Sequence, residues 1–560
     1  MNKLKIQKLA TALTVVSTLL LMAGGQAFAS FQTINQNTGF ASQNDGTATV
    51  TDAFASLNQN AQVIANVGDG TVATGGSMVS DNTMPGSVAS GVVALDGSFS
   101  NNTNTNTLNQ TGSFISDPLA ENNTTGANSA NNSTTTLNET IGASNTNAAD
   151  VGSAITADAV SGNNLISNNT GAGTLGTGDV NGALGADTVA NNNFLTLTAT
   201  GTGTANNSAM NTITGFGSAN DSVVAVNNAI AAENDNTANV ANDLFATLSS
   251  GGNIISDNTG AVNASTGDVA GVTNVSSNVN SNTTAVTMSG NPTITSSNGT
   301  TGANSVNNAE ADVAQTVGVT NSNTATVANA VTNTTESGGN LVSGNTGAAA
   351  LQTGNASDST TISNGTIAAP SNTNSTTIGM GSGGTSVTAA NSTTGSGSTN
   401  NIDANLATGV TSENTNAMTV GNSVTSHTDT GGNTISNNTG STGGGSSSVS
   451  TGDASSATSI SNSVNTNTTA VTMNPAATVS STNTTTGANS VNDSAATVSN
   501  NVALSNTNTA NITNTVTNTT ESGGNVVSGN TTGGAVTTGS ASLSFGATNT
   551  GNSNTTTVGQ

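Results

Sequence analysis

The feature that most constrains this chain is a long repeat kept in strict register. A Thr-Gly-x-x-Ser-x-Asn motif, with variations, occurs six times in the sequence. Its glycines are Gly39, Gly126, Gly215, Gly302, Gly395 and Gly487, with spacings of 87, 89, 87, 93 and 92 residues. A disordered linker has no reason to keep six copies in such register. The sequence therefore predicts an ordered repeat architecture.

Asparagines hold fixed positions in every repeat. An Asn-x-Asn pair begins 19 residues after each repeat glycine, and a Gly-Gly-Asn-Φ-Φ-Ser-x-Asn-Thr-Gly motif (Φ is apolar) puts a further asparagine 43 residues after it. The pairs are Asn58 and Asn60, Asn145 and Asn147, Asn234 and Asn236, Asn321 and Asn323, Asn414 and Asn416, and Asn506 and Asn508. The single asparagines are Asn82, Asn169, Asn258, Asn345, Asn438 and Asn530. A second Asn-x-Asn often follows, so landmarks fall roughly every 22 residues, a common length for one coil of a β-solenoid.

The segments around the first pair have the period of a β-strand. Positions 19, 21, 25 and 29 after the glycine share one parity, and position 25 is always Ile or Val, as in Val240 and Val327. The opposite parity carries polar residues such as Thr324 and Thr326. Alternation of this kind predicts strands with one face inside. β-Branched residues favour the same structure.

The paired asparagines share the inward parity, which suggests a structural role. Stacked amides inside a solenoid can bond along its axis as a ladder. A buried amide without a partner costs roughly 1–3 kcal/mol, so the pattern makes most sense if neighbours stack. The competing interpretation is that Asn-x-Asn marks turns, because asparagine tolerates positive φ.

We therefore expect an all-β fold: one elongated, right-handed, parallel β-solenoid of ~22-residue coils, arranged in six ~90-residue repeats. At ~4.8 Å per coil the array would be a rod on the order of 110 Å long. The alternative is a string of six β-sandwiches. It is less favoured because the chain has no Trp or Tyr and only 10 Phe to build separate cores.

Basic residues are confined to the start of the chain. Lys3, Lys5 and Lys8 precede an apolar run over residues 9–22 that ends in Ala27-Phe28-Ala29. This pattern predicts a signal peptide over residues 1–29 and a single repeat array over residues 30–560. We expect the protein to be secreted to the cell exterior or surface, with no transmembrane segment after cleavage.

After that cleavage the chain would keep all 28 carboxylates and only His427 as a basic side chain. We therefore expect no nucleic-acid partner, because such binding relies on Lys and Arg. One histidine within the chain cannot build a metal cluster or a histidine-based triad, so no catalytic, cofactor or metal site is predicted and we expect no enzyme activity. Thr-Gly-Asp turns at Asp179, Asp268 and Asp453 leave weak calcium binding open, with turn capping as the competing interpretation.

Two minor alternatives rest on other residue patterns. Isolated carboxylates such as Glu139 and Glu310 allow a polysaccharide-active β-helix enzyme, if two of them meet from different coils. Thr-x-Thr strings such as Thr196/Thr198/Thr200 are similar to the flat threonine arrays of ice-binding solenoids. These strings do not recur at one repeat position, so we expect the array to be interrupted.

Residues 31–560 resemble the repetitive secreted β-solenoid surface proteins of bacteria, both adhesin stalks and curlin-type fibre subunits, in repeat length and in Gly, Asn and Ser content. The spaced glutamines of curlin coils are mostly replaced by asparagine. The resemblance implies a structural or adhesive extracellular role. We predict a fibre or surface-layer subunit that binds copies of itself end to end, because the repeat pattern runs uncapped from Phe31 to Asn554. The alternative is an adhesin stalk that binds a host or matrix ligand through Phe40, Phe54, Phe99 and Phe114.

Overall fold

The computed structural model describes residues 32–114, 117–201, 206–289, 292–366, 369–381, 384–440, 445–473 and 477–559. The predicted signal peptide, residues 1–29, lies outside the described residues. All regular elements in the described part of the chain are β-strands, and the paired strands run parallel. The all-β, solenoid-like prediction is confirmed. In the same ranges, no helix has the length and apolar character needed to cross a bilayer.

The strands form five sheets. The long sheet consists of 31-residue strands: β2 (Gln43–Ala73), β7 (Ala130–Val160), β12 (Ala219–Ser249), β17 (Val306–Glu336), β23 (Thr399–Asp429) and β28 (Val491–Glu521). The facing sheet consists of β5 (Val93–Phe114), β10 (Val180–Gly201), β15 (Val269–Ser289), β20 (Ala356–Asn364), β21 (Ser371–Met380), β26 (Ala454–Met473) and β31 (Ala541–Gly559).

Three smaller sheets complete the coil. One contains β1 (Gln32–Gln36), β6 (Leu119–Asn123), β11 (Asn206–Thr214), β16 (Thr293–Thr301), β22 (Thr385–Thr394) and β27 (Ala477–Thr486). The second contains β3 (Met78–Ser80), β8 (Leu165–Ser167), β13 (Ile254–Ser256), β18 (Leu341–Ser343), β24 (Thr434–Ser436) and β29 (Val526–Ser528). The third contains β4 (Gly86–Ala89), β9 (Gly173–Gly176), β14 (Val262–Ser265), β19 (Ala349–Gln352), β25 (Ser447–Ser450) and β30 (Gly534–Thr537).

Strands that pair come from successive repeats. Asn147 lies opposite Asn236, and Asn236 lies opposite Asn323. One pass of the chain around the coil, here called a rung, therefore takes a whole repeat, and the prediction of ~22-residue coils is wrong. The landmarks mark positions around one large coil, because a 31-residue strand runs through the whole first pair without a corner. The β-sandwich alternative also fails, since sandwich strands pair antiparallel and here the repeats pair with each other in parallel.

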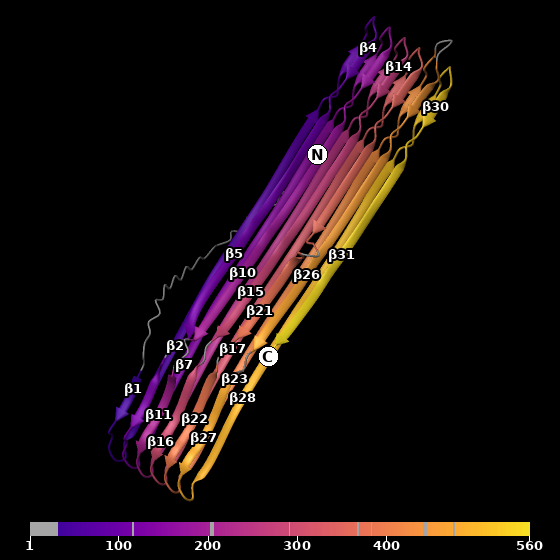
Figure 1. Cartoon of the computed structure of the whole chain (residues 1–560). Helices are drawn as coiled ribbons and strands as arrows, with labels where there is room; N and C mark the ends of the chain where they lie inside the picture. Colours follow the sequence, from indigo (N-terminus) through magenta and orange to yellow (C-terminus); the bar gives the residue numbers. More distant parts are fainter. Residues whose placement is uncertain are drawn as a thin grey trace.

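The molecule is longest along its strands (Figure 1). A 31-residue strand spans about 100 Å at ~3.3 Å per residue. The rungs begin at β1, β6, β11, β16, β22 and β27, and at ~4.8 Å each they stack to only about 25–30 Å. The predicted rod of about 110 Å along the stacking direction is therefore wrong. The described residues form a flat, wide stack instead.

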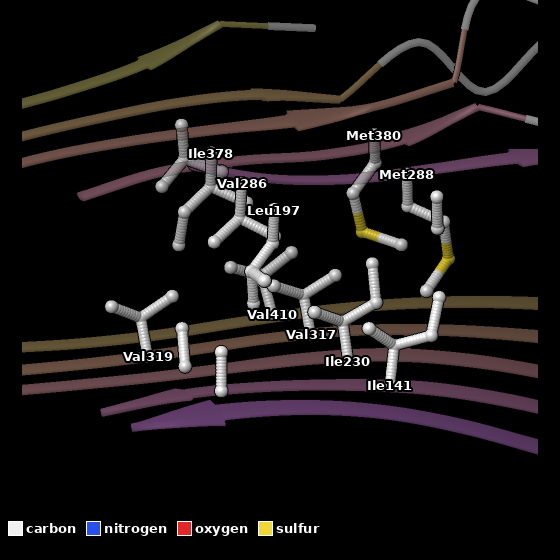
Figure 2. Close-up of a cluster of buried hydrophobic side chains, with 14 of the residues drawn as sticks. Ile141, Leu197, Ile230, Val286, Met288, Val317, Val319, Ile378, Met380 and Val410 are labelled. Carbon is white, nitrogen blue, oxygen red and sulfur yellow. The ribbon is translucent and has the colours of Figure 1, made fainter. Parts of the chain in front are cut away.

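The core lies between the long sheet and the facing sheet. Figure 2 shows Ile230, Val317 and Val410 of the long sheet pointing toward the facing sheet, where Val286 and Ile378 point back at them. All five side chains are at most 2% exposed. Each such residue contributes about 1.5–3 kcal/mol by leaving water. Columns of the same residue class therefore hold the rungs together in register.

Close backbone stacking at one corner explains the Gly-Gly pairs. A Cβ atom on Gly251 would lie 1.8 Å from the carbonyl oxygen of Gly338, and one on Gly338 would lie 2.0 Å from that of Gly431. The second glycine of each pair, such as Gly339 with φ of 70°, adopts the left-handed conformation. The close backbone contact therefore requires the first glycine, and the second position needs a left-handed residue, which in the second rung is Asn163 with φ of 59°.

Candidate functional site: asparagine ladders and open edges

The first asparagines of the predicted pairs lie inside the long sheet and bond from rung to rung. Nδ2 of Asn145 donates to Oδ1 of Asn234 at 3.0 Å, and the chain of bonds continues through Asn321 and Asn414 to Asn506 at 2.7–2.9 Å. Threonines of the facing sheet complete it, because Asn321 Nδ2 also donates to Thr376 Oγ1 at 2.7 Å. Asn58, in the first rung, lies opposite Asn145.

The second asparagines of the pairs build a network that crosses the core. Asn236 Nδ2 donates to Asn323 Oδ1 in the next rung at 3.0 Å and to Asn282 Oδ1 in the facing sheet at 2.8 Å. Asn282 Nδ2 in turn donates to Asn323 Oδ1 at 2.9 Å. All three side chains are fully buried. Each amide of this network therefore bonds both along the stack and across it.

The same network continues to the last rung through Asn416. Asn323 Nδ2 donates to Asn416 Oδ1 at 3.0 Å, and Asn416 Nδ2 donates to Asn508 Oδ1 at 3.0 Å. Asn416 is fully buried and also donates across the core to Asn467 Oδ1 at 2.9 Å. Bonds across the core recur at both ends of the stack, from Asn60 to Asn106 and from Asn508 to Asn554. Asn147 makes this bond to Asn193 at 2.8 Å.

The asparagines of the second motif form a ladder at the end of the coil. Both the backbone N–H and Nδ2 of Asn169 donate to Oδ1 of Asn258, at 3.1 and 2.9 Å. Asn82 makes the same two bonds to Asn169, and Asn438 makes them to Asn530. Asn345 links Asn258 to Asn438 in the same way. Each accepting amide therefore holds both a side chain and a backbone group of the preceding rung.

The turn interpretation applies to a different set of asparagines. Positive φ values of 52° to 63° occur at the first residue of the second Asn-x-Asn pair, and not at the first pair. These residues are Asn104, Asn191, Asn280, Asn372, Asn465 and Asn552. They also bond between rungs, since Asn191 Nδ2 donates to Asn280 Oδ1 at 3.0 Å. These asparagines therefore both form a ladder between rungs and adopt the left-handed backbone conformation of a turn.

Sequence reasoning missed three further ladders, of which the first runs through all six rungs. Asn131 Nδ2 donates to Asn220 Oδ1 at 2.8 Å, in a column that runs from Asn44 to Asn492. Similar bonds join Asn242 to Asn329, and Asn253 to Asn340. The sequence contains the pattern that predicts the first of these ladders, because an asparagine stands five residues after every repeat glycine.

The aspartates of the Thr-Gly-Asp turns bond to the next rung. Oδ1 of Asp179 accepts the backbone N–H of Asp268 at 2.9 Å, and Oδ1 of Asp453 accepts that of Ser540 at 2.7 Å. Nowhere in the described ranges do three or more His, Cys, Asp or Glu residues lie together in a way that could hold a metal ion. The geometry of these turns therefore favours capping.

Carboxyl groups with a raised pKa occur in three places: at Glu310, where burial is the largest cause, at Asp358, and at the pair Glu336 and Asp429. Asp358 is 4% exposed and accepts hydrogen bonds from Ser426 Oγ at 2.7 Å and Asn333 Nδ2 at 2.9 Å. Burial raises the pKa of Asp358, although these bonds oppose the shift. Glu336 and Asp429 lie opposite each other in adjacent rungs, and burial followed by their mutual repulsion raises the pKa of Glu336.

The interior ladders of the long sheet all run in one direction. Wherever two of these amides bond from rung to rung, Nδ2 donates to an Oδ1 in the following rung, as in Asn307 to Asn400 and Asn329 to Asn422. The last rung therefore presents amide N–H groups at its open edge. The first rung presents amide oxygens, because Asn44 donates to Asn131 and β2 pairs with β7 alone.

Comparisons of the chain with protein-family models, with curated proteins and with solved structures gave no match.

Proposed function

We propose that the protein is a secreted structural subunit whose copies stack along the hydrogen-bonding direction into an extracellular fibre or surface layer. The observation that carries this proposal is that both ends of the stack are open sheet edges. β2 and β5 have a partner on one side only, as do β28 and β31. These edges lie on opposite faces of the molecule (Figure 1). Long, unpaired edge strands are templates for pairing with another chain.

Apolar side chains at the edges support stacking. Val498 of the last rung is 52% exposed, whereas Leu406, its partner in the rung before, is 4% exposed. Phe54 of the first rung is 42% exposed and lies over Ile141, which is 4% exposed. A stacked copy would cover both edges as the interior rungs cover each other. The gain per apolar residue is about 1.5–3 kcal/mol.

The proposal includes the predicted handedness of the array, its mode of action and its partner. Residues 30–560 act as one right-handed array after the signal peptide is removed, and the array works by assembly and without catalysis or a cofactor. Its partner is a second copy of the chain. Its low charge density supports this, because carboxylates spread over a wide face repel weakly at physiological salt, where screening acts over ~8 Å.

Electron microscopy and fibre diffraction of purified protein lacking residues 1–29 test the proposal. Raising protein and salt concentration should give ribbons at least about 100 Å wide, because the strands lie across the ribbon. Diffraction should show a repeat of about 4.8 Å along the ribbon axis. Protein that stays monomeric under these conditions contradicts the proposal.

The adhesin alternative gains little from the phenylalanines on which it rests. Phe99 packs against the core, and Phe54 lies at the open edge that a stacked copy would cover. Phe40, 73% exposed at a turn, is the remaining candidate. The side chain of Phe114 lies outside the described residues. Phe40, Phe54 and Phe99 therefore do not form a single binding patch.

Ice binding is a second candidate because of one observation. The pairing brings Thr111, Thr198 and Thr287 into one outward column of the facing sheet. Gly379 and Thr472 continue the column in later rungs. The array is nevertheless interrupted, because Gly379 breaks this column and Thr196 in the neighbouring column lies opposite Asn109 and Ala285. Thermal hysteresis of dilute protein tests this function, and freezing behaviour equal to that of buffer rejects it.

A further inference from the structure

We infer that the contact between copies is polar and has a single register: the last rung of one copy binds the first rung of the next, and the asparagine ladders continue across the junction. This inference rests on the proposed stacking function and specifies its interface. The occupant of each open edge is therefore the opposite edge of a second copy of this chain.

Hydrogen-bond donors remain at the last rung. In the rung before it, Asn414 Nδ2 makes two bonds of 2.8 Å, to Thr469 Oγ1 within the rung and to Asn506 Oδ1 in the next. In the last rung, Asn506 Nδ2 donates to Thr556 Oγ1 alone, also at 2.8 Å. Asn514 Nδ2 likewise donates only to Asn549 Oδ1 of the facing sheet, at 3.1 Å. Asn506 and Asn514 therefore each keep an N–H for a following rung.

Hydrogen-bond acceptors remain at the first rung in the same columns. Asn58, Asn60 and Asn66 stand 19, 21 and 27 residues after Gly39, and Asn506, Asn508 and Asn514 stand at the same distances after Gly487. From the fourth rung on, the amide oxygens of these columns accept from the rung before, as Asn321 does from Asn234 and Asn414 does from Asn321. The oxygens of the first rung therefore match the donors of the last.

Apolar columns match in the same register. Val50 and Val498 both stand 11 residues after their glycine, and Ile64 and Ile512 both stand 25 residues after theirs. Ile64 and Ile512 already pack on the two ends of one core cluster. An edge that bound its own copy would face donor with donor, or acceptor with acceptor, and could not continue these columns in parallel. A heterologous contact that propagates is the geometry that satisfies both sets.

Two variants, each blocked at one edge, test the polarity. The first-edge variant carries Val50→Asp and Ile64→Asp, and the last-edge variant carries Val498→Asp and Ile512→Asp. All four side chains are at least partly exposed in the monomer but would be buried in a junction, where an unpaired charge is costly. Circular dichroism and thermal melting of each variant establish that the coil remains folded.

Analytical ultracentrifugation should show each variant alone as a monomer, while an equimolar mixture forms a dimer and nothing longer, because one free first edge meets one free last edge. Dimers of either variant alone would overturn the polarity, since they require an edge to bind itself. Absence of fibres from the unmodified protein would instead reject the stacking function. Should a variant fail to fold, the single variants Asn58→Asp and Asn506→Asp take its place. Fibres of Asn506→Asp, which has lost the amide donor, should grow more slowly relative to wild type than fibres of Asn58→Asp, which keeps its acceptor oxygen. Equal growth rates of the two variants would overturn the inference.

Discussion

Asn236 and Asn282 lie on opposite sheets, and Nδ2 of Asn236 donates to Oδ1 of Asn282 at 2.8 Å. The two residues are 46 positions apart in the chain, and both are fully buried. This bond ties the long sheet to the facing sheet between the apolar clusters of the core. Because the same pair occurs from rung to rung, these polar side chains specify the register together with the apolar columns.

Removing one amide from a central ladder should weaken the coil strongly. Asn321 donates to Thr376 and Asn414 and accepts from Asn234, so Asn321→Ala leaves buried partners unsatisfied at about 1–3 kcal/mol each. We expect a large fall in the midpoint of thermal unfolding. The control is Asn401→Ala, whose amide bonds Asn308 on the exposed face and should change stability by at most about 0.5 kcal/mol. Equal effects of the two changes on the melting temperature would contradict the claim that the interior ladder stabilises the fold more than the exposed amide pair.

Stability should increase as pH falls toward the acid range. Burial raises the pKa of Asp358 above its usual 3.8, so the folded state binds its proton more tightly than the unfolded state. The stabilisation is complete below the unfolded pKa and is lost as pH rises through the folded pKa. Asp358→Asn should therefore have a higher melting temperature than the parent at neutral pH. Its melting temperature should also change less as pH passes through the range between the unfolded and the folded pKa of Asp358. A variant that melts lower at neutral pH would show that the ionised carboxylate is needed by Ser426 and Asn333.

Fibre growth should be limited by one pair of like charges. In the proposed junction Asp493 would lie beside Asp45, since both stand six residues after their repeat glycine. Inside the molecule the same column puts Asn308 beside Asp221, with a hydrogen bond of 2.8 Å. Asp493→Asn should speed growth, measured by light scattering, and reduce its dependence on salt. Glu521→Gln is the matched control, because Ala73 stands at its position in the first rung. If the two changes have the same effect, net charge and not this pair controls growth.

A methyl group at the stacked corner should separate the rungs. The Cβ of Gly338→Ala would lie 2.0 Å from the carbonyl oxygen of Gly431, which backbone movement must relieve. We expect a loss of several kcal/mol and a clearly lower melting temperature, the usual consequence of overpacking a rigid backbone contact. Gly421→Ala serves as the control, because nothing lies within 4 Å of a Cβ built there. A melting curve for Gly338→Ala that matches the control would mean that the corner is looser than the structure shows.

The sequence by itself determined the strand class, the repeat register and the inward-facing parity of the first asparagine pairs. Those features are local or periodic: Val240 and Val327 alternate with polar residues whatever the coil size, and stacking preserves the period. Landmarks every 22 residues or so could not show whether the chain closes after one landmark or after a whole repeat. Only the tertiary structure decided this, because closure depends on pairing between residues as distant as Asn147 and Asn236. The same distant pairing gave the amides a direction, and with it two different edges.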